Sequence, residues 1–171
     1  MNAPKYHTYA DDAEACAKES ELVNSLDDDG LFIDEAFDAV GSSLYKDPFR
    51  PPNGLLPPEI TEWNRINQLE IRGVDNPSTF TGDMDMVSQV KQGALGNCWL
   101  ISAFTMLSSE QAKAVVVSDS LRGKGIYTVK FYKEGLWVYV HVDDRIPCNM
   151  AGDIYFSKSL DRNVSVMRGG G

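Results

Sequence analysis

The residues best suited to covalent chemistry lie in one short segment, Gln92 to Ala103. Cys98 stands where a turn marked by Gly93 and Gly96 gives way to an apolar stretch without Gly, Pro or charge, long enough for about three helical turns. This pattern predicts that Cys98 lies in the first turn of a buried helix. A helix N-terminus offers unpaired N–H groups and partial positive charge, and both favour the thiolate, which is the nucleophilic form of cysteine.

Two interpretations of Cys98 compete at this point. A free cysteine on an apolar helix is commonly a packing residue. The catalytic interpretation gains support from Gln92, six residues upstream across the glycine turn. A glutamine amide near a nucleophile can donate a hydrogen bond to a developing oxyanion, together with the backbone N–H of the nucleophile itself.

The segment Gln-Gly-x-x-Gly-Asn-Cys-Trp, residues 92–99, resembles the active-site segment of the calpain family of papain-like cysteine proteases. The resemblance implies the cysteine half of a papain-like α+β domain, with a central helix beginning at Cys98 beside a small antiparallel sheet. It also implies that Cys98 is the nucleophile and that Gln92 belongs to the oxyanion hole. Trp99 would pack behind the helix.

Two weaker matches to the same family occur in the expected order. Residues 44–52, followed by Trp63, resemble the stretch that leads into a calpain core, and residues 138–147 resemble a calpain strand ending in Val-Asp-Asp-x-x-Pro. These matches divide the chain into three parts. Residues 1–40 form an acidic and partly helical N-terminal region, residues 41–163 form the cysteine subdomain of a calpain-like core, and residues 164–171 match nothing.

The family's catalytic histidine and asparagine are not found in the matched segments. The chain has two histidines, His7 in a loose N-terminal tail and His141 inside a predicted strand. The resemblance implies a cysteine endopeptidase acting on polypeptides, whose His and Asn come from a second subdomain or a second chain. This chain is therefore expected to be inactive alone. Alternatives are a non-enzymatic regulatory or binding module, and a truncated gene product or unfinished gene model.

Charge and cysteine usage narrow the class of partner. The net charge is −9, and residues 1–40 carry all of it, because they contain 11 acidic side chains against Lys5 and Lys18. This acidity argues against nucleic acid and anionic membranes as partners.

Three cysteines without a CxxC pair argue against a disulfide framework or a zinc site. Without an apolar signal-peptide core or a stretch long enough to span a bilayer, the chain is expected to be cytoplasmic.

Calcium is implied only by the family resemblance. Calpain cores commonly carry an acidic calcium ligand nine residues before the nucleophile, and Gln89 occupies that position. A neutral amide oxygen can coordinate calcium but contributes no charge, so the residues here do not support a metal site.

Secondary structure was predicted from periodicity and from turn residues. Helices are expected over 11–26, 32–45, 98–107 and 110–117. Strands are expected over 126–132 and 136–142, joined as a hairpin by Lys133-Glu134-Gly135, with a further short strand over 154–156. Five prolines within residues 47–58 predict an extended segment that packs, together with Trp63, against the core.

Overall fold

The computed structural model describes residues 6–44, 60–69, 90–92, 97–149, 154 and 158–159. The fold is α+β, as the sequence predicted, and consists of two compact units. The first unit comprises Met1–Asp38 with Gln111–Asp144, and the second comprises Ala39–Glu110 with Arg145–Gly171. The predicted proline-rich segment and the tail at 164–171 lie outside the described residues.

An antiparallel sheet in the order β3-β4-β5 forms the centre of the first unit. Its strands are β3 (Val116–Ser118), β4 (Ile126–Lys133) and β5 (Leu136–Asp143). The last two form the predicted hairpin, in which Lys133 pairs with Leu136. The turn residues Glu134 and Gly135 have φ values of 52° and 86°. Positive φ at both positions suits the right-handed twist of a two-residue hairpin.

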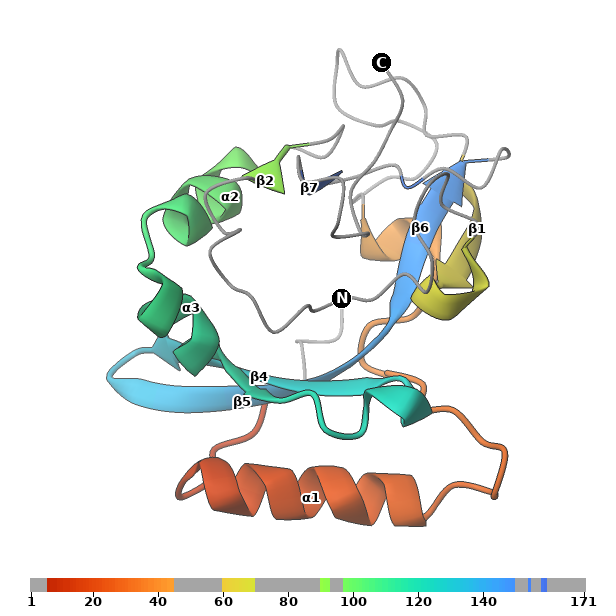
Figure 1. Cartoon of the computed structure of the whole chain (residues 1–171), viewed down its shortest axis with the longest axis horizontal. Coiled ribbons are helices and arrows are strands. Elements are labelled where there is room, and N and C mark those ends of the chain that lie inside the picture. The colour runs from red at the N-terminus through yellow and green to blue at the C-terminus, as the bar shows by residue number, and fades with distance from the viewer. Residues whose placement is uncertain are drawn as a thin grey trace. The chain divides into compact units, whose positions relative to one another are not determined.

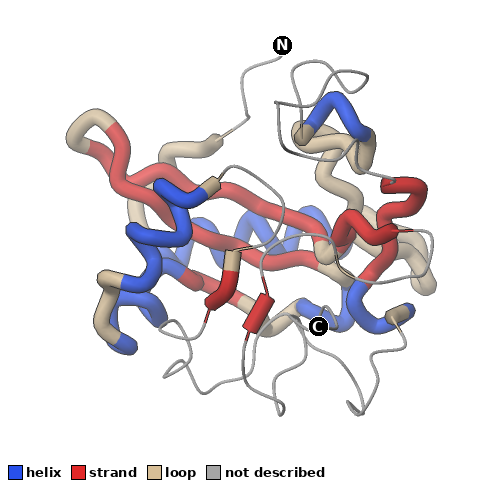
Figure 2. Tube along the Cα trace, turned by 90° about the horizontal axis from the view of Figure 1, so that it is seen from above, coloured by secondary structure: helices blue, strands red, loops and turns tan. Residues whose placement is uncertain are grey.

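Helix α1 (Asp12–Asn24) runs along one face of this sheet (Figures 1 and 2). Its predicted start is confirmed, because the Asp11 side chain accepts a hydrogen bond from the Glu14 N–H at 2.9 Å and so caps the helix. Two sets of side-chain hydrogen bonds hold this end of α1 against the sheet. The Lys130 ammonium donates to both carboxylate oxygens of Asp12, at 2.7 and 2.8 Å, and the Tyr139 hydroxyl donates to the same carboxylate at 2.9 Å.

A buried polar network joins the middle of α1 to the sheet. Ser118 and Thr128 donate hydroxyl hydrogen bonds to the two carboxylate oxygens of Glu19, at 3.1 and 2.6 Å. Because the single hydroxyl proton of Thr128 is donated to Glu19, the Thr128 oxygen acts as the acceptor for the N–H at Nδ1 of His141, at 2.9 Å. Nε2 of His141 is then the acceptor for the Tyr9 hydroxyl, at 3.0 Å. The hydrogen-bond donors thus follow one direction, from the Tyr9 hydroxyl through a neutral His141 and the Thr128 hydroxyl to the Glu19 side chain.

The neutral state of His141 predicts a loss of stability in mild acid. Burial lowers the pKa of His141 to about 4, and the neighbouring His7 contributes in the same direction. Between pH 6.5 and 4 the unfolded chain therefore binds a proton that the folded chain does not, so the free energy of unfolding falls as the pH falls. The expected loss between pH 7 and pH 4.5 is about 2 kcal/mol, measurable by urea denaturation at these two pH values.

The matched variant for this measurement is His141→Gln, which keeps a polar side chain but cannot titrate. We expect its stability to change much less over the same pH interval. A loss as steep as that of the unmodified protein would show that other groups cause the acid sensitivity. Asp12, whose pKa the Lys130 hydrogen bond lowers, loses its contribution only in more acidic solution.

The second unit contains two short antiparallel pairs and a helix. Strand β1 (Ile60–Arg65) pairs with β6 (Arg145–Asn149), and β2 (Val90–Lys91) pairs with β7 (Lys158–Ser159). Helix α2 covers Cys98–Thr105. A cluster of four buried residues forms the local core, with Ile146 packed against it: Ile66, Leu69, Cys148 and Ile154. Trp63 is only partly buried.

Four short helical elements complete the described residues. Helix α3 covers Ser109–Val115, and single 3-10 turns occupy Ile66–Gln68 and Arg122–Lys124. A further 3-10 turn at Gly41–Ser43 is the only helical part of the region where a helix over 32–45 was expected. None of the described helices has the length and apolar character needed to cross a membrane.

The prediction of a helix over 32–45 is wrong, and Asp34 provides the physical reason. Its carboxylate accepts hydrogen bonds from the backbone N–H groups of Ala36 and Phe37, at 2.9 and 3.2 Å. This local bonding competes with the helical pattern. The segment is also tied to the rest of its unit, since the Phe32 N–H donates to the Lys124 carbonyl and the Asp34 N–H donates to Asp143.

Candidate active site

Gln92 and Cys98 are carried by two elements that contact each other in the second unit (Figure 1). Gln92 follows directly after β2, and Cys98 is the first residue of α2. The glycine turn between them, residues 93–96, lies outside the described residues. The predicted helix start is therefore observed after the turn, and the short strand before it was not predicted.

The start of α2 is defined by backbone hydrogen bonds. The Asn97 carbonyl accepts from the N–H groups of Leu100 and Ile101, at 2.9 and 3.1 Å. Asn97 occupies the N-cap position, as the sequence predicted, but its side chain makes no capping hydrogen bond. Cys98 thus begins the first helical turn, where backbone N–H groups are without helical acceptors and can receive an anion.

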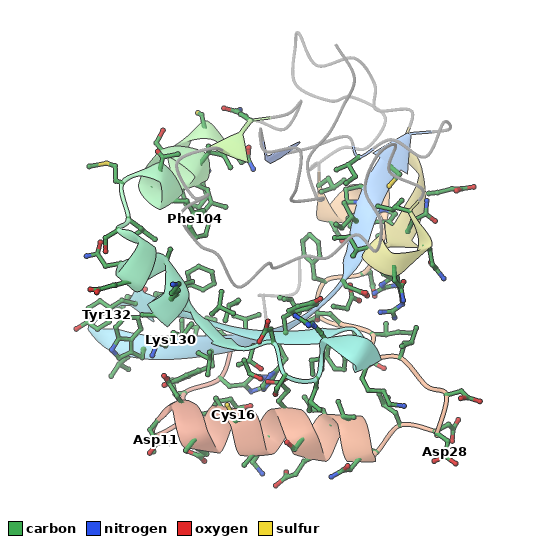
Figure 3. The ribbon with its side chains drawn as sticks, viewed as in Figure 1. Asp11, Cys16, Asp28, Phe104, Lys130 and Tyr132 are labelled. Carbon is green, nitrogen blue, oxygen red and sulfur yellow. The ribbon has the colours of Figure 1, made fainter. Side chains whose placement is uncertain are left out.

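Cys98 is the accessible thiol among the three cysteines. Its side chain is exposed, whereas Cys148 is fully buried and Cys16 is partly buried. Figure 3 shows Cys16 on the side of α1 that faces the sheet. Burial, together with the carboxylate of Glu19, raises the pKa of the Cys16 thiol and so suppresses its thiolate form. Reagents and substrates in solution therefore reach Cys98 most easily.

The apolar helix that carries Cys98 is not buried, and this corrects two predictions. Trp99 is 71% exposed and Met106 is 85% exposed, and no residue of α2 is fully buried. Trp99 therefore does not pack behind the helix in this chain. Leu100, Ile101 and Phe104 are partly buried, so part of the apolar surface of α2 remains exposed to solvent. An exposed apolar surface of this kind is typical of an interaction face.

Neither histidine lies in the unit that carries Cys98. His141 belongs to β5, and both of its ring nitrogens take part in the buried network with Tyr9 and Thr128. His7 stacks on Tyr9 with ring centroids 5.4 Å apart. His141 therefore acts as a structural residue of the first unit, as its position in a strand suggested.

Gln89, at the position where calpain cores commonly carry an acidic calcium ligand, lies outside the described residues. Among the residues that the structure describes, no group of three or more His, Cys, Asp or Glu side chains is arranged to hold a metal ion.

Most of this chain matches known proteins. A family model described as calpain family cysteine protease matches residues 32–167. The calpain-type cysteine protease DEK1 of Zea mays is 36% identical over 135 residues, which are 77% of this chain and 6% of that protein. The calpain-2 catalytic subunit of Bos taurus is 33% identical over 141 residues, which are 80% of this chain and 19% of that protein.

A third relative, calpain clp-4 of Caenorhabditis elegans, is 32% identical over 161 residues, 90% of this chain and 21% of that protein. These matches place the chain among the cysteine proteases. Within that class, it belongs to the calpain family. The chain spans only between about 6 and 21% of the length of these relatives.

Proposed function

We propose that this chain supplies the cysteine half of a calpain-type endopeptidase active site. The Cys98 thiolate attacks the carbonyl carbon of a peptide bond, and the negative charge moves to the carbonyl oxygen. The amide of Gln92 and the N–H of Cys98 donate hydrogen bonds to this oxyanion. The observation that supports the proposal most directly is the exposed Cys98 at the first position of the apolar, partly exposed α2.

The remaining steps need groups from outside this chain. A histidine must take the thiol proton and give it to the leaving amine, and an Asn or Asp must orient that histidine. Water then hydrolyses the acyl-enzyme and releases the free thiol. We propose that a second subdomain or a second chain provides the His and the Asn and covers the exposed surface of α2. The chain alone is then inactive.

Calcium dependence and a cytoplasmic location belong to this proposal by family resemblance. Gln89 contributes no charge at the position where an acidic ligand is common, so we expect a weak calcium requirement from that position. The test is the cleavage rate of the completed protease as a function of added calcium.

The proposal is tested by completing the core. The chain is joined or mixed with the His- and Asn-bearing subdomain of a calpain relative, and cleavage of a fluorogenic peptide is followed. We expect no cleavage by either part alone, cleavage by the combination, and loss of cleavage on Cys98→Ala. Cleavage that survives Cys98→Ala would overturn the assignment of the nucleophile, as would a stably associated combination that does not cleave.

A second measurement uses the chain without any partner. Iodoacetamide should modify Cys98 at least about tenfold faster than Cys16 or Cys148, because buried thiols react slowly. Peptide mass mapping after short exposure identifies the modified residue. Preferential modification of Cys16 would contradict the accessibility on which the proposal depends.

A non-enzymatic regulatory or binding module is the second candidate, and the exposed surface of α2 is compatible with it. The two candidates predict different effects of replacing Cys98. In a binding module, Cys98→Ala leaves partner binding and any downstream effect unchanged, whereas in the protease it abolishes peptide cleavage.

A further inference from the structure

We propose that the first unit binds a basic, apolar peptide segment of a partner protein in a groove beside α1. The groove is a cavity of about 470 Å³, open to solvent, between the C-terminal part of α1, residues 31–36 and two imidazoles. Its lining includes Leu22, Leu26, Leu31 and Ile33, together with two carboxylates, Asp34 and Glu35. We call this cavity the α1 groove. It contains neither Gln92 nor Cys98.

The apolar part of the α1 groove offers contacts that the chain itself leaves uncovered. Leu22 lies in the last turn of α1, and Leu26 follows just after the helix ends at Asn24; both side chains line the groove. Leu22 is 36% exposed and Ile33 is 53% exposed. An apolar side chain of a partner that fills this space removes both surfaces from water, which is worth about 25 cal/mol per Å² before the entropic cost of binding.

The charge of the α1 groove determines which sign of charge a partner must carry. Among the residues that the structure describes, its lining contains two carboxylates and no lysine or arginine. Asp34 is buried and its carboxylate accepts two backbone N–H bonds, but Glu35 is exposed, and none of the described residues forms an ion pair with it. The acidic run Asp27–Asp29 lies in the same connection between α1 and Ile33, where the Lys124 ammonium donates to the carbonyls of Asp28 and Gly30 and offsets part of this charge.

Neither His141 nor Lys18 offsets the charge of the two lining carboxylates. His141 is neutral, because its Nε2 accepts from Tyr9 and its Nδ1 donates to Thr128. A smaller cavity of about 220 Å³ adjoins the groove, sharing His7, Leu22, Ser25 and His141 with it. Lys18 lines this second cavity, but its ammonium is held by Glu21 at 2.7 Å. The complementary ligand therefore carries positive charge.

A peptide fits this combination better than a small amine. The two adjoining cavities together follow the last two turns of α1, so the contact surface is elongated, with apolar positions beside an acidic rim. Grooves of this kind bind apolar anchor residues, and the flanking charges set the orientation and the choice of partner. The ligand class is a short segment with leucine-like side chains next to Lys or Arg.

The test uses the full chain and a defined probe. The probe is a fluorescein-labelled peptide of 14 residues in which pairs of leucine and lysine alternate, and binding is followed by fluorescence anisotropy. One comparison peptide has glutamate in place of lysine, and another has serine in place of leucine. We expect the leucine–lysine peptide to bind and both comparison peptides to bind at least about tenfold more weakly.

Two charge-reversal variants separate the groove from general attraction to an acidic protein. Glu35→Lys should weaken binding about tenfold, because it places a cation on the rim. Glu134→Lys makes the same charge change in the β4–β5 turn, away from the groove, and should alter the affinity by less than about twofold. Both side chains are exposed, so both variants should fold, which circular dichroism checks.

Three results would overturn the proposal. They are no binding of the leucine–lysine peptide, equal loss of affinity in the two variants, and equally tight binding of the serine–lysine peptide, which would indicate attraction by net charge alone. An Ile33→Ser variant tests the apolar contact separately and should also weaken binding.

Discussion

Replacement of Gln92 by alanine in the completed protease is expected to lower kcat/KM for a peptide substrate by about 10²–10³-fold. Gln92 follows β2, which contacts the helix that begins with Cys98, and its amide is the proposed side-chain donor to the oxyanion. Removing one oxyanion donor from an acyl-transfer enzyme typically costs this much in rate. The backbone N–H of Cys98 remains in the variant, so activity should fall without disappearing.

The division of the effect between kcat and KM identifies its origin. A donor that acts on the developing oxyanion stabilises the transition state more than the substrate, so kcat should carry the loss and KM should change little. Gln111→Ala, which removes an exposed glutamine from α3, is the matched control and should keep activity within about twofold. If Gln92→Ala raised KM alone, Gln92 would be a substrate-binding residue and its assignment to the oxyanion hole would be wrong.

The elements that sequence analysis predicted correctly are those with strong local signals. Asp11 before an amphipathic run fixed the start of α1, and Gly135 after Glu134 fixed the hairpin turn, because only a few residue types suit these backbone positions. The helix over 110–117 was predicted two residues too long. It ends at Val115, and the β-branched residues Val116 and Val117 enter β3.

The pairing of β1 with β6 could not be predicted from local pattern. Trp63 pairs with Pro147 and Arg65 pairs with Arg145, about 80 residues away along the chain. Both strands are rich in polar or charged residues, and β6 contains a proline, which argues against a strand. The predicted strand over 154–156 is described only at Ile154, which forms a single bridge to Cys148.

At the candidate site, the start of α2 at Cys98 followed from the glycine turn and the apolar stretch, but the exposure of α2 did not. An apolar helix predicts burial, and periodicity cannot show whether the covering element belongs to the same chain. The buried network was also missed, although the sequence held a signal for it. Thr128 and His141 are directly opposed in the hairpin, a register that the turn fixes, and opposed polar residues within apolar strands indicate a buried polar contact.

The buried network gives the largest expected effect on stability. Replacing Glu19 by alanine should lower the free energy of unfolding by about 3–5 kcal/mol, because the carboxylate accepts two hydroxyl hydrogen bonds and is 1% exposed. Without it, Ser118 and Thr128 lose their acceptor inside the protein, and a cavity forms between α1 and the sheet. Urea denaturation at pH 7, far above the pKa of His141, measures the change without interference from its titration.

Two comparisons show whether the loss comes from the network. Glu21→Ala removes a carboxylate from the same helix whose ion pair with Lys18 is exposed, so it should cost less than about 1 kcal/mol. A double-mutant cycle between Glu19→Ala and His141→Gln should show a coupling of at least about 0.5 kcal/mol, because Thr128 links the two side chains. If the losses in unfolding free energy of the two single variants simply added, the donors would not act as one directed chain. If Glu19→Ala cost no more stability than Glu21→Ala, the Glu19 carboxylate would not be buried in solution.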